Sequence, residues 1–197
     1  DHGQIFWVHA VSVGEVQAAL PLIRGWLNTF PRARVVVSTT TPTGMARVRS
    51  VFGTEVIHRY APYDLWGATG RFLDRVDPDL AVIVETEIWP NIIERCAQRS
   101  IPVIFANARL SERSARGYRW LRPLLRKTFQ AVTAIGAQSI DDARRLEQIG
   151  APAEIITVTG STKFDVTVSP SVTEAGQVLR RAWGVHRSVW IAASTHE

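Results

Sequence analysis

Carboxylates, hydroxyls and an indole stand at positions of this chain where they could bind or activate a ligand. Glu15 closes the segment WVHAVSVGE (7–15), between an apolar run and a helical pattern. A carboxylate at such a junction can cap the helix, because the helix dipole favours a negative charge there by roughly 0.3–1 kcal/mol. It can also take a proton from a hydroxyl group of a ligand. Ser12 has the same two interpretations, helix cap or hydroxyl contact, and Gly14 in the turn can let a ligand approach the backbone.

A second polar group lies in ETEIWPN (85–91). Glu85 and Glu87 share a face if the strand continues through them, whereas a turn at the strand end separates them. The segment can therefore present a pair of carboxylates, or it can be a strand end followed by a capped helix. Trp89 and Asn91 add a flat apolar surface and an amide, a combination suited to holding a sugar.

A third candidate is the hydroxyl-rich loop STTTPTG (38–44), which contains Thr40 and Thr41. Backbone N–H groups at the start of a following helix can hold a phosphate. The alternative is a loop that only caps the helix. The Gly-Lys-Ser/Thr ending of a P-loop is missing here, and SVGE lacks the GxGxxG of a dinucleotide site.

The sequence does not favour a metal site. The segment DPD (77–79) resembles a metal-binding Asp-x-Asp motif, but it precedes a predicted strand and so belongs to the edge of the sheet opposite the ligands. His9 lies within an apolar strand, where we expect a hydrogen-bonded core histidine. The other histidines have no ligand spacing, so we predict no metal and no cofactor.

Alternating strand-like and helix-like segments must position these side chains. Short Val- and Ile-rich runs indicate parallel strands that are covered on both faces: Ile5–Val11, Arg34–Ser38, Glu55–Arg59, Leu80–Val84, Val103–Ala106, Ala131–Ala137, Ile155–Val158 and Val189–Ala193. Helical patterns lie between them: Val16–Phe30, Gly44–Val51, Leu65–Val76, Asn91–Arg99, Ser111–Phe129, Ile140–Ile149 and Thr173–Trp183. Pro123 falls inside the fifth helical segment, which we expect to be kinked or split.

This order of elements predicts an α/β fold, a Rossmann-like doubly wound parallel sheet. Ligands of such sheets bind outside the carboxyl ends of the strands. Glu15, Thr39–Thr43, Glu85–Asn91 and Asn107–Ser111 all follow predicted strands, so we expect them along one ligand-binding edge.

The composition narrows the possible classes of protein. The 197 residues are 46% apolar, enough for one domain and part of a second. A single cysteine, Cys96, excludes a disulfide framework and favours a reducing compartment. No run of about 18 apolar residues could span a bilayer, and the start DHGQIF lacks the regions of a signal peptide.

The net charge of +5 is concentrated in one segment. RLSERSARGYRWLRPLLRK (109–127) holds seven Arg or Lys and one Glu, which gives +6 and leaves −1 for the rest of the chain. Tyr118, Trp120 and several leucines are interleaved with the charges. Such a segment predicts an anionic partner, either phosphate, an acidic membrane surface or nucleic acid. We do not expect nucleic acid, because no recognised nucleic-acid-reading motif accompanies the patch.

The character of the chain changes near Gly160. TGSTKFDVTVSPSV is polar and rich in turn residues, and one further helix and strand pattern follow it. We therefore predict a first domain over 1–159, a linker over 160–172 and the first unit of a second Rossmann-like domain over 173–197. The chain stops at IAASTHE, at a predicted strand end, and so looks cut.

Six of these segments together resemble a known family. WVHAVSVGE, STTTPTG, ETEIWPN, NARLSERS, GSTKFD and AASTHE match, in this order, landmarks of the 3-deoxy-D-manno-octulosonic acid (Kdo) transferases. The likeness covers nearly the whole chain. It implies the GT-B arrangement, in which two Rossmann-like domains face each other across a cleft.

The resemblance also implies an activity and its partners. Kdo transferases move Kdo from the donor substrate CMP-Kdo to the lipid A precursor, with inversion and without a metal, at the cytoplasmic face of the bacterial inner membrane. The family's catalytic base falls on Glu15, and the basic segment 109–127 would meet lipid A phosphates or acidic headgroups. The resemblance places acceptor contacts at Ser12, Gly14, Thr40, Thr41, Glu85, Glu87, Trp89, Asn91, Asn107 and Arg109, and donor contacts at Lys163, Ser194, Thr195, His196 and Glu197.

Two departures and two alternatives accompany this interpretation. The family's membrane-anchoring segment and most of its donor domain are missing from the sequence, so we expect the chain to be inactive alone. One alternative is another GT-B sugar-nucleotide transferase or epimerase. The other is a non-enzymatic α/β module that docks on membranes.

Overall fold

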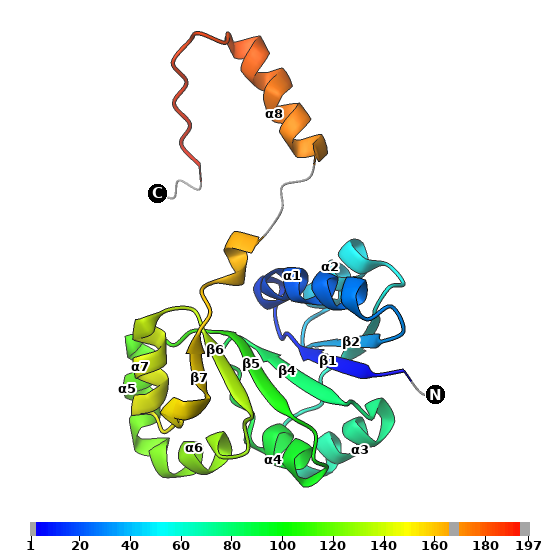
Figure 1. The fold of residues 1–197 in the computed structure, drawn as a ribbon, viewed down its shortest axis with the longest axis vertical. Helices are drawn as coiled ribbons and strands as arrows, with labels where there is room; N and C mark the ends of the chain where they lie inside the picture. The colour runs from blue at the N-terminus through cyan, green and yellow to red at the C-terminus, as the bar shows by residue number, and fades with distance from the viewer. Residues whose placement is uncertain (1–2, 166–169, 194–197) are drawn as a thin grey trace. The chain divides into compact units, whose positions relative to one another are not determined.

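Seven of the predicted strands form one parallel sheet in the computed structural model, which describes residues 3–165 and 170–193 (Figure 1). The β-branched residues that dominate these segments suit strands buried on both faces. The strands are β1 (Ile5–His9), β2 (Arg34–Thr39), β3 (Ile57–Tyr60), β4 (Leu80–Val84), β5 (Val103–Ala108), β6 (Ala134–Ala137) and β7 (Ile156–Val158). The predicted α/β, Rossmann-like fold class is therefore confirmed.

Helices connect consecutive strands, as parallel pairing requires. They are α1 (Val13–Thr29), α2 (Pro42–Phe52), α3 (Trp66–Val76), α4 (Pro90–Gln98), α5 (Glu112–Tyr118), α6 (Arg122–Phe129), α7 (Ile140–Gln148) and α8 (Pro170–Trp183). Short 3₁₀ turns lie at η1 (Arg119–Leu121), η2 (Ala153–Ile155) and η3 (Thr162–Asp165). The helical pattern around Pro123 is split, as expected, into α5, η1 and α6.

The strand order β3-β2-β1-β4-β5-β6-β7 places β1 beside β4 at the centre of the sheet. Their register pairs Phe6 with Leu80 and His9 with Ile83. The chain runs outward in one direction from β1 and in the other from β4, which defines the topological switch point of a doubly wound sheet. A ligand crevice is expected where the carboxyl ends of these two strands meet.

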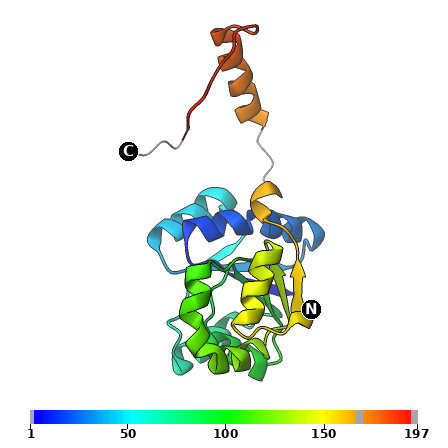
Figure 2. The same ribbon diagram turned by 90° about the vertical axis from the view of Figure 1, so that its left-hand side faces the viewer.

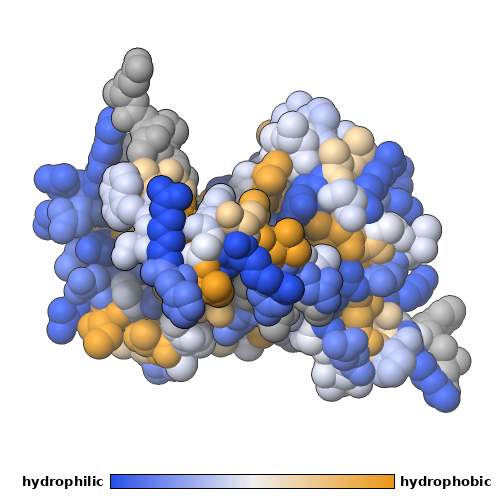
Figure 3. Space-filling model, turned by 90° about the horizontal axis from the view of Figure 1, so that it is seen from above, coloured by the Kyte–Doolittle hydropathy of each residue, from blue (hydrophilic) through white to orange (hydrophobic). Residues whose placement is uncertain are grey.

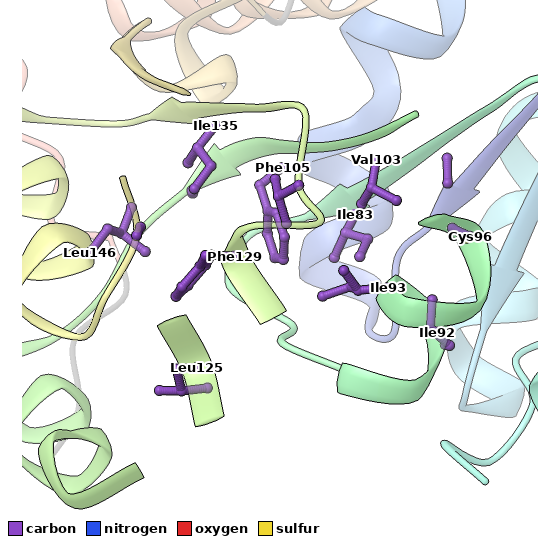
Figure 4. Close-up of a cluster of buried hydrophobic side chains, with 14 of the residues drawn as sticks. Ile83, Ile92, Ile93, Cys96, Val103, Phe105, Leu125, Phe129, Ile135 and Leu146 are labelled. Atoms are coloured by element: carbon purple, nitrogen blue, oxygen red, sulfur yellow. The ribbon is translucent and has the colours of Figure 1, made fainter. Parts of the chain in front are cut away.

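Two apolar clusters cover the two faces of the sheet. The side chains of Phe6, Val8 and Val37 pack with α1 and α2. The opposite face carries the larger cluster, in which Phe105 and Phe129 lie with their ring centroids 6.3 Å apart (Figure 4). This two-sided burial fixes the sheet and so fixes where its loops emerge.

Some boundaries differ from the sequence-based expectation. The strand predicted over Val189–Ala193 is wrong: residues 189–193 have no strand partner within the described part of the chain. An extended segment needs a neighbouring strand to satisfy its N–H and C=O groups, and an apolar run in the sequence does not show whether such a neighbour is present. In DPD, the Asp79 carboxylate accepts from the N–H of Ile5 at 2.7 Å, at the amino edge, as the structural interpretation of that motif expected.

The chain divides into two compact units, residues 1–165 and 166–197. The first contains the sheet, and the second contributes α8 to the described residues. The assignment of 160–172 as a linker and of 173–197 to a donor domain stays a prediction. None of the helices in the described residues is both long and apolar enough to cross a membrane.

Candidate active site

Glu15 sits in the first turn of α1, directly after β1, at the switch point. Ser12 is the N-cap of this helix: its Oγ accepts from the N–H of Glu15 at 3.3 Å and donates to Glu15 Oε1 at 2.8 Å. Glu15 Oε2 accepts from the N–H of Val11 at 2.8 Å. Glu15 therefore does cap the helix, and this capping holds its carboxylate in one place.

The surroundings of Glu15 change its acidity. Its side chain is only 6% exposed. Burial is the main cause that raises the pKa of Glu15 to about 7, and the nearby carboxylates of Glu87 and Glu85 add to it, against the opposing hydrogen bonds from Ser12 and Val11. A carboxyl group with a pKa near 7 exchanges a proton readily at neutral pH, as a general base must. The capping and proton-transfer roles are thus compatible.

Glu85 lies just beyond β4 and turns away from the strand direction. Its φ is +60°, a left-handed conformation that is uncommon outside glycine, asparagine and aspartate. Its Oε2 accepts from Arg109 Nε at 3.1 Å, and the backbone of Arg109 is bonded to the hydroxyl of Thr86. The loops after β4 and β5 are therefore tied together, and the predicted residues Glu85 and Arg109 are brought into contact.

Glu87 and Trp89 form a second pair on the same loop. The indole N–H of Trp89 donates to Glu87 Oε2 at 2.8 Å, and the ring meets His9 edge-on, with the centroids 5.0 Å apart. His9 is buried, and burial lowers its pKa to about 4. Its Nδ1 pairs with Ser38 Oγ at 2.9 Å, whereas its Nε2 has no partner in the described part of the chain, so the expected core histidine is hydrogen-bonded through one ring nitrogen.

A hollow of about 580 Å³ opens beside these carboxylates. Glu85, Glu87 and Arg109 line it, together with side chains of α5, α7 and the loops that precede these helices. Both glutamates line this space, although the backbone at Glu85 is in a left-handed conformation. Sequence reasoning had placed Thr86, Leu110 and Ser111 along the ligand-binding edge. It had not assigned the remaining lining residues to the site: Ser114, Tyr118, Gln138, Asp142 and Arg145.

Other predicted acceptor residues have structural partners. The Asn91 amide donates to the carbonyl of Asp64 at 2.7 Å, while the Asp64 carboxylate accepts from the first N–H groups of α4. Thr40 Oγ1 donates to the carbonyl of Val11 at 2.9 Å, and Thr41 is the N-cap of α2. A Cβ at Gly14 would meet only Ser12 Oγ, at 3.8 Å, so the turn beside Glu15 is sterically open. Ligand contacts for these residues stay predictions.

Asn107, at the end of β5, holds the segment that contains Lys163. Its φ is +57° and it is 3% exposed. Asn107 Oδ1 accepts from the N–H of Thr162 at 3.1 Å, and its own carbonyl accepts from Gln138 Nε2 at 2.9 Å. The turn η3 also packs against α1. Lys163, which is exposed, is therefore anchored at the same edge as Glu15, while Ser194, Thr195, His196 and Glu197 lie outside the described residues.

This anchor predicts a measurable stability effect. Asn107→Ala removes the acceptor for the Thr162 N–H and forces alanine into a left-handed conformation, so we expect the free energy of unfolding to fall by about 2 kcal/mol. Asn107→Gly, which tolerates the same φ, should cost less. Thr162→Ala is the control, because Thr162 Oγ1 has no hydrogen-bond partner among the residues that the structure describes. Urea unfolding measures all three, and an equal loss in the control would contradict the anchor.

The basic segment extends from one edge of the sheet to the other. Arg109 lies at the carboxyl edge beside Glu85, whereas Arg122 and Arg126 line a hollow with Gly150 and Pro152, just before η2 and β7. Trp120 and Leu124 are 78% and 51% exposed. The segment therefore presents charge and apolar surface together, while its start belongs to the candidate active site.

The described residues contain no group of three or more His, Cys, Asp or Glu side chains placed to hold a metal ion. The predicted independence of a metal or cofactor stays a prediction.

Solved structures place the fold in a class. The chain is similar to the UDP-GlcNAc 2-epimerase from Neisseria meningitidis, with a TM-score of 0.61 and 15% identity over 91% of this chain and 54% of that one. It is also similar to Acinetobacter baumannii MurG, with a TM-score of 0.55 and 9% identity over 86% and 47%. At such identities the likeness concerns the fold alone: the sheet is a Rossmann-like domain of the kind found in GT-B glycosyltransferases and epimerases.

The sequence identifies the family. The chain belongs to the Kdo transferases, since residues 1–166 match the family model described as 3-deoxy-D-manno-octulosonic-acid transferase (kdotransferase). It is 40% identical over 193 residues to the 3-deoxy-D-manno-octulosonic acid transferase of Haemophilus influenzae, and 38% identical over 197 residues to that of Bordetella pertussis. These alignments take in 98% and 97% of the chain but 45% and 44% of the relatives, so the chain spans about half the length of the curated relatives it matches.

Proposed function

We propose that this chain supplies the acceptor side of a Kdo transferase, with Glu15 as the general base. The observation that carries the proposal is a buried carboxylate with a pKa of about 7 at the switch point between β1 and β4, held by Ser12 and Val11. The donor is CMP-Kdo and the acceptor is the lipid A precursor, the substrates that the family resemblance implies.

In the proposed reaction, Glu15 takes the proton of an acceptor hydroxyl as its oxygen attacks the anomeric carbon of Kdo. The bond from that carbon to the CMP phosphate oxygen breaks, and CMP leaves with the electron pair, so the anomeric configuration inverts. General-base help of this kind contributes about 10²–10⁴-fold. No step needs a metal, because CMP already leaves as a stable anion.

The surrounding side chains have distinct roles in this proposal. The Arg109 guanidinium holds Glu85 in place, and the Trp89 indole holds Glu87, so that both carboxylates border the hollow as hydrogen-bond acceptors for sugar hydroxyls. Their negative charge also keeps the Glu15 proton affinity high. Ser12 and Gly14 shape the turn beside the base, and Lys163 offers a cation to the donor from the anchored segment.

The experiment is an assay of the full-length protein that contains this chain, with CMP-Kdo and the lipid A precursor. We expect transfer that persists in the presence of a chelator, whereas the chain by itself should not catalyse it. Turnover of a UDP-sugar but not of CMP-Kdo would replace the proposal with another GT-B transferase or an epimerase.

We also propose that the protein works at the cytoplasmic face of the inner membrane, with the segment 109–127 against it. The exposed Trp120 and Leu124 beside Arg122, Arg126 and Lys127 combine apolar surface with positive charge, which suits an anionic interface.

This membrane contact predicts that Trp120→Ser weakens binding to phosphatidylglycerol vesicles by about tenfold, since it removes one interfacial side chain. Trp190→Ser, which removes an 89% exposed indole elsewhere in the chain, is the matched control. Vesicle co-sedimentation measures both, and equal binding of the two variants would reject a contact through Trp120.

A further inference from the structure

Four arginines from two neighbouring helices surround a hollow that the proposed reaction leaves unused. Arg116 lies on α5, Arg119 starts η1, and Arg144 and Arg145 lie on α7. Figure 2 shows α5 and α7 standing side by side. The hollow between them has a volume of about 340 Å³, and the rest of its lining consists of Glu112, Ala115, Asp141 and Gln148.

The charges around this hollow do not cancel. Arg144 pairs with Asp141 at 3.4 Å, and Arg145 pairs with Asp142 at 3.5 Å and donates to the carbonyl of Leu110. Within the described residues, Arg116 and Arg119 take part in no ion pair. Four guanidinium groups face two carboxylates in the lining, so the hollow is positive and two of its cations are available.

The residue types point to a phosphate group as the ligand. A guanidinium presents paired N–H donors in a plane, and this geometry matches two oxygens of a phosphate. All four cations are arginine, whose charge persists at every physiological pH. The lining contains no aromatic ring on which a base could stack and no large apolar side chain to enter a bilayer. A compact dianion with three free oxygens fits such a wall better than a lipid headgroup surface.

The hollow also adjoins the candidate active site. Arg145 lines both this space and the 580 Å³ hollow that contains Glu85 and Glu87. A ligand whose phosphate is held between α5 and α7 can therefore extend past Arg145 toward the two glutamates.

Figure 3 colours one face of the molecule by hydropathy, and hydrophilic side chains on this face are mixed with smaller apolar patches.

We propose that the hollow between α5 and α7 is a binding site for a phosphomonoester, in which Arg116 and Arg119 hold the phosphate oxygens and the paired Arg144 and Arg145 form the opposite wall. Where that ligand is the acceptor of the transfer reaction, the inference rests on the function proposed above. The binding test below does not depend on it, since it uses neither Kdo nor Glu15.

Phenyl phosphate is the probe, titrated into the ¹⁵N-labelled protein and followed by amide chemical shifts. We expect saturable shifts at Ala115, Arg116 and Arg144. The double variant Arg116→Gln/Arg119→Gln should weaken binding by tenfold or more, since it removes two charged hydrogen-bond donors. The control Arg122→Gln/Arg126→Gln removes equal charge from the neighbouring surface and should change the affinity by less than about threefold.

Three outcomes would overturn the proposal. Shifts that fail to saturate would indicate ionic screening without a site. An equal loss in both double variants would indicate a diffuse basic surface. Unchanged phenyl phosphate binding in Arg116→Gln/Arg119→Gln, accompanied by lost binding to phosphatidylglycerol vesicles, would assign these arginines to the membrane. Failure of Kdo transfer with intact phosphate binding would instead count against the proposed function and leave this site standing.

Discussion

Replacing Glu15 by glutamine in the full-length protein is expected to lower the rate of Kdo transfer by about 10²–10⁴-fold, because the variant loses the proposed base. Glutamine keeps the shape of the side chain. Its amide oxygen can still accept from the N–H of Val11, and its NH₂ group can donate to Ser12 Oγ, so the helix remains capped. The loss should therefore appear in kcat while the fold is retained. Single-turnover transfer from CMP-Kdo measures it.

Two controls isolate the chemistry. Glu154→Gln removes an exposed carboxylate from η2 and should leave the rate unchanged. Stability gives the second control. The folded-state pKa of Glu15, about 7, lies above its ordinary value of 4.5, so its contribution to stability is full below about pH 4.5 and is lost as pH rises through about 7. The free energy of unfolding of Glu15→Gln, measured relative to that of the parent, should thus increase as the pH rises from 5 to 8. Transfer within a few-fold of the parent would reject the base.

The acid side of the pH profile should fall steeply. With a Glu15 pKa of about 7, protonation removes the base below that pH. The value of kcat/KM should fall by about fiftyfold between pH 7 and pH 5, with a slope that approaches tenfold per pH unit well below the pKa. Above about pH 8 the profile should be level with respect to this group. Initial rates from pH 5 to pH 9 at saturating CMP-Kdo, with the acceptor concentration varied, measure it.

Glu87→Gln provides the diagnostic variant for this profile. The charge of Glu87 raises the pKa of Glu15, so its removal should move the midpoint of the acid limb to lower pH. A rate that is independent of pH between 5 and 7, or a midpoint that Glu87→Gln leaves in place, would show that another group controls the reaction.

The general architecture and the base candidate could be read from the sequence because their signals are local. Val- and Ile-rich runs between helical patterns predicted the parallel sheet. The spacing of Ser12 and Glu15 at the start of α1 is that of a helix cap, and the position after β1 put Glu15 at the ligand edge. Local patterns thus located the carboxylate, and the fold then determined its burial.

Other parts of the site had no local signal. Asn91 bonds to Asp64, 27 residues away; Asn107 bonds to Gln138 at a separation of 31 and to Thr162 at a separation of 55. Asparagine suits any of several turns and sugar contacts, so sequence alone could not choose among them. The left-handed backbone at Glu85 was equally hidden, because glutamate rarely marks such a turn. The strand at 189–193 failed because its residues indicated extension and could not indicate a partner.

The central pairing of β1 with β4 has a consequence for how the molecule acquires its reactivity. About seventy residues, comprising most of α1 followed by β2, α2, β3, α3 and β4, separate Glu15 from Glu85 along the chain. During synthesis, a nascent polypeptide that ends before β4 holds the first carboxylate without its electrostatic neighbours or the wall of the hollow. Long-range closure of the sheet must come first, and only then does an ordinary glutamate become a competent proton acceptor.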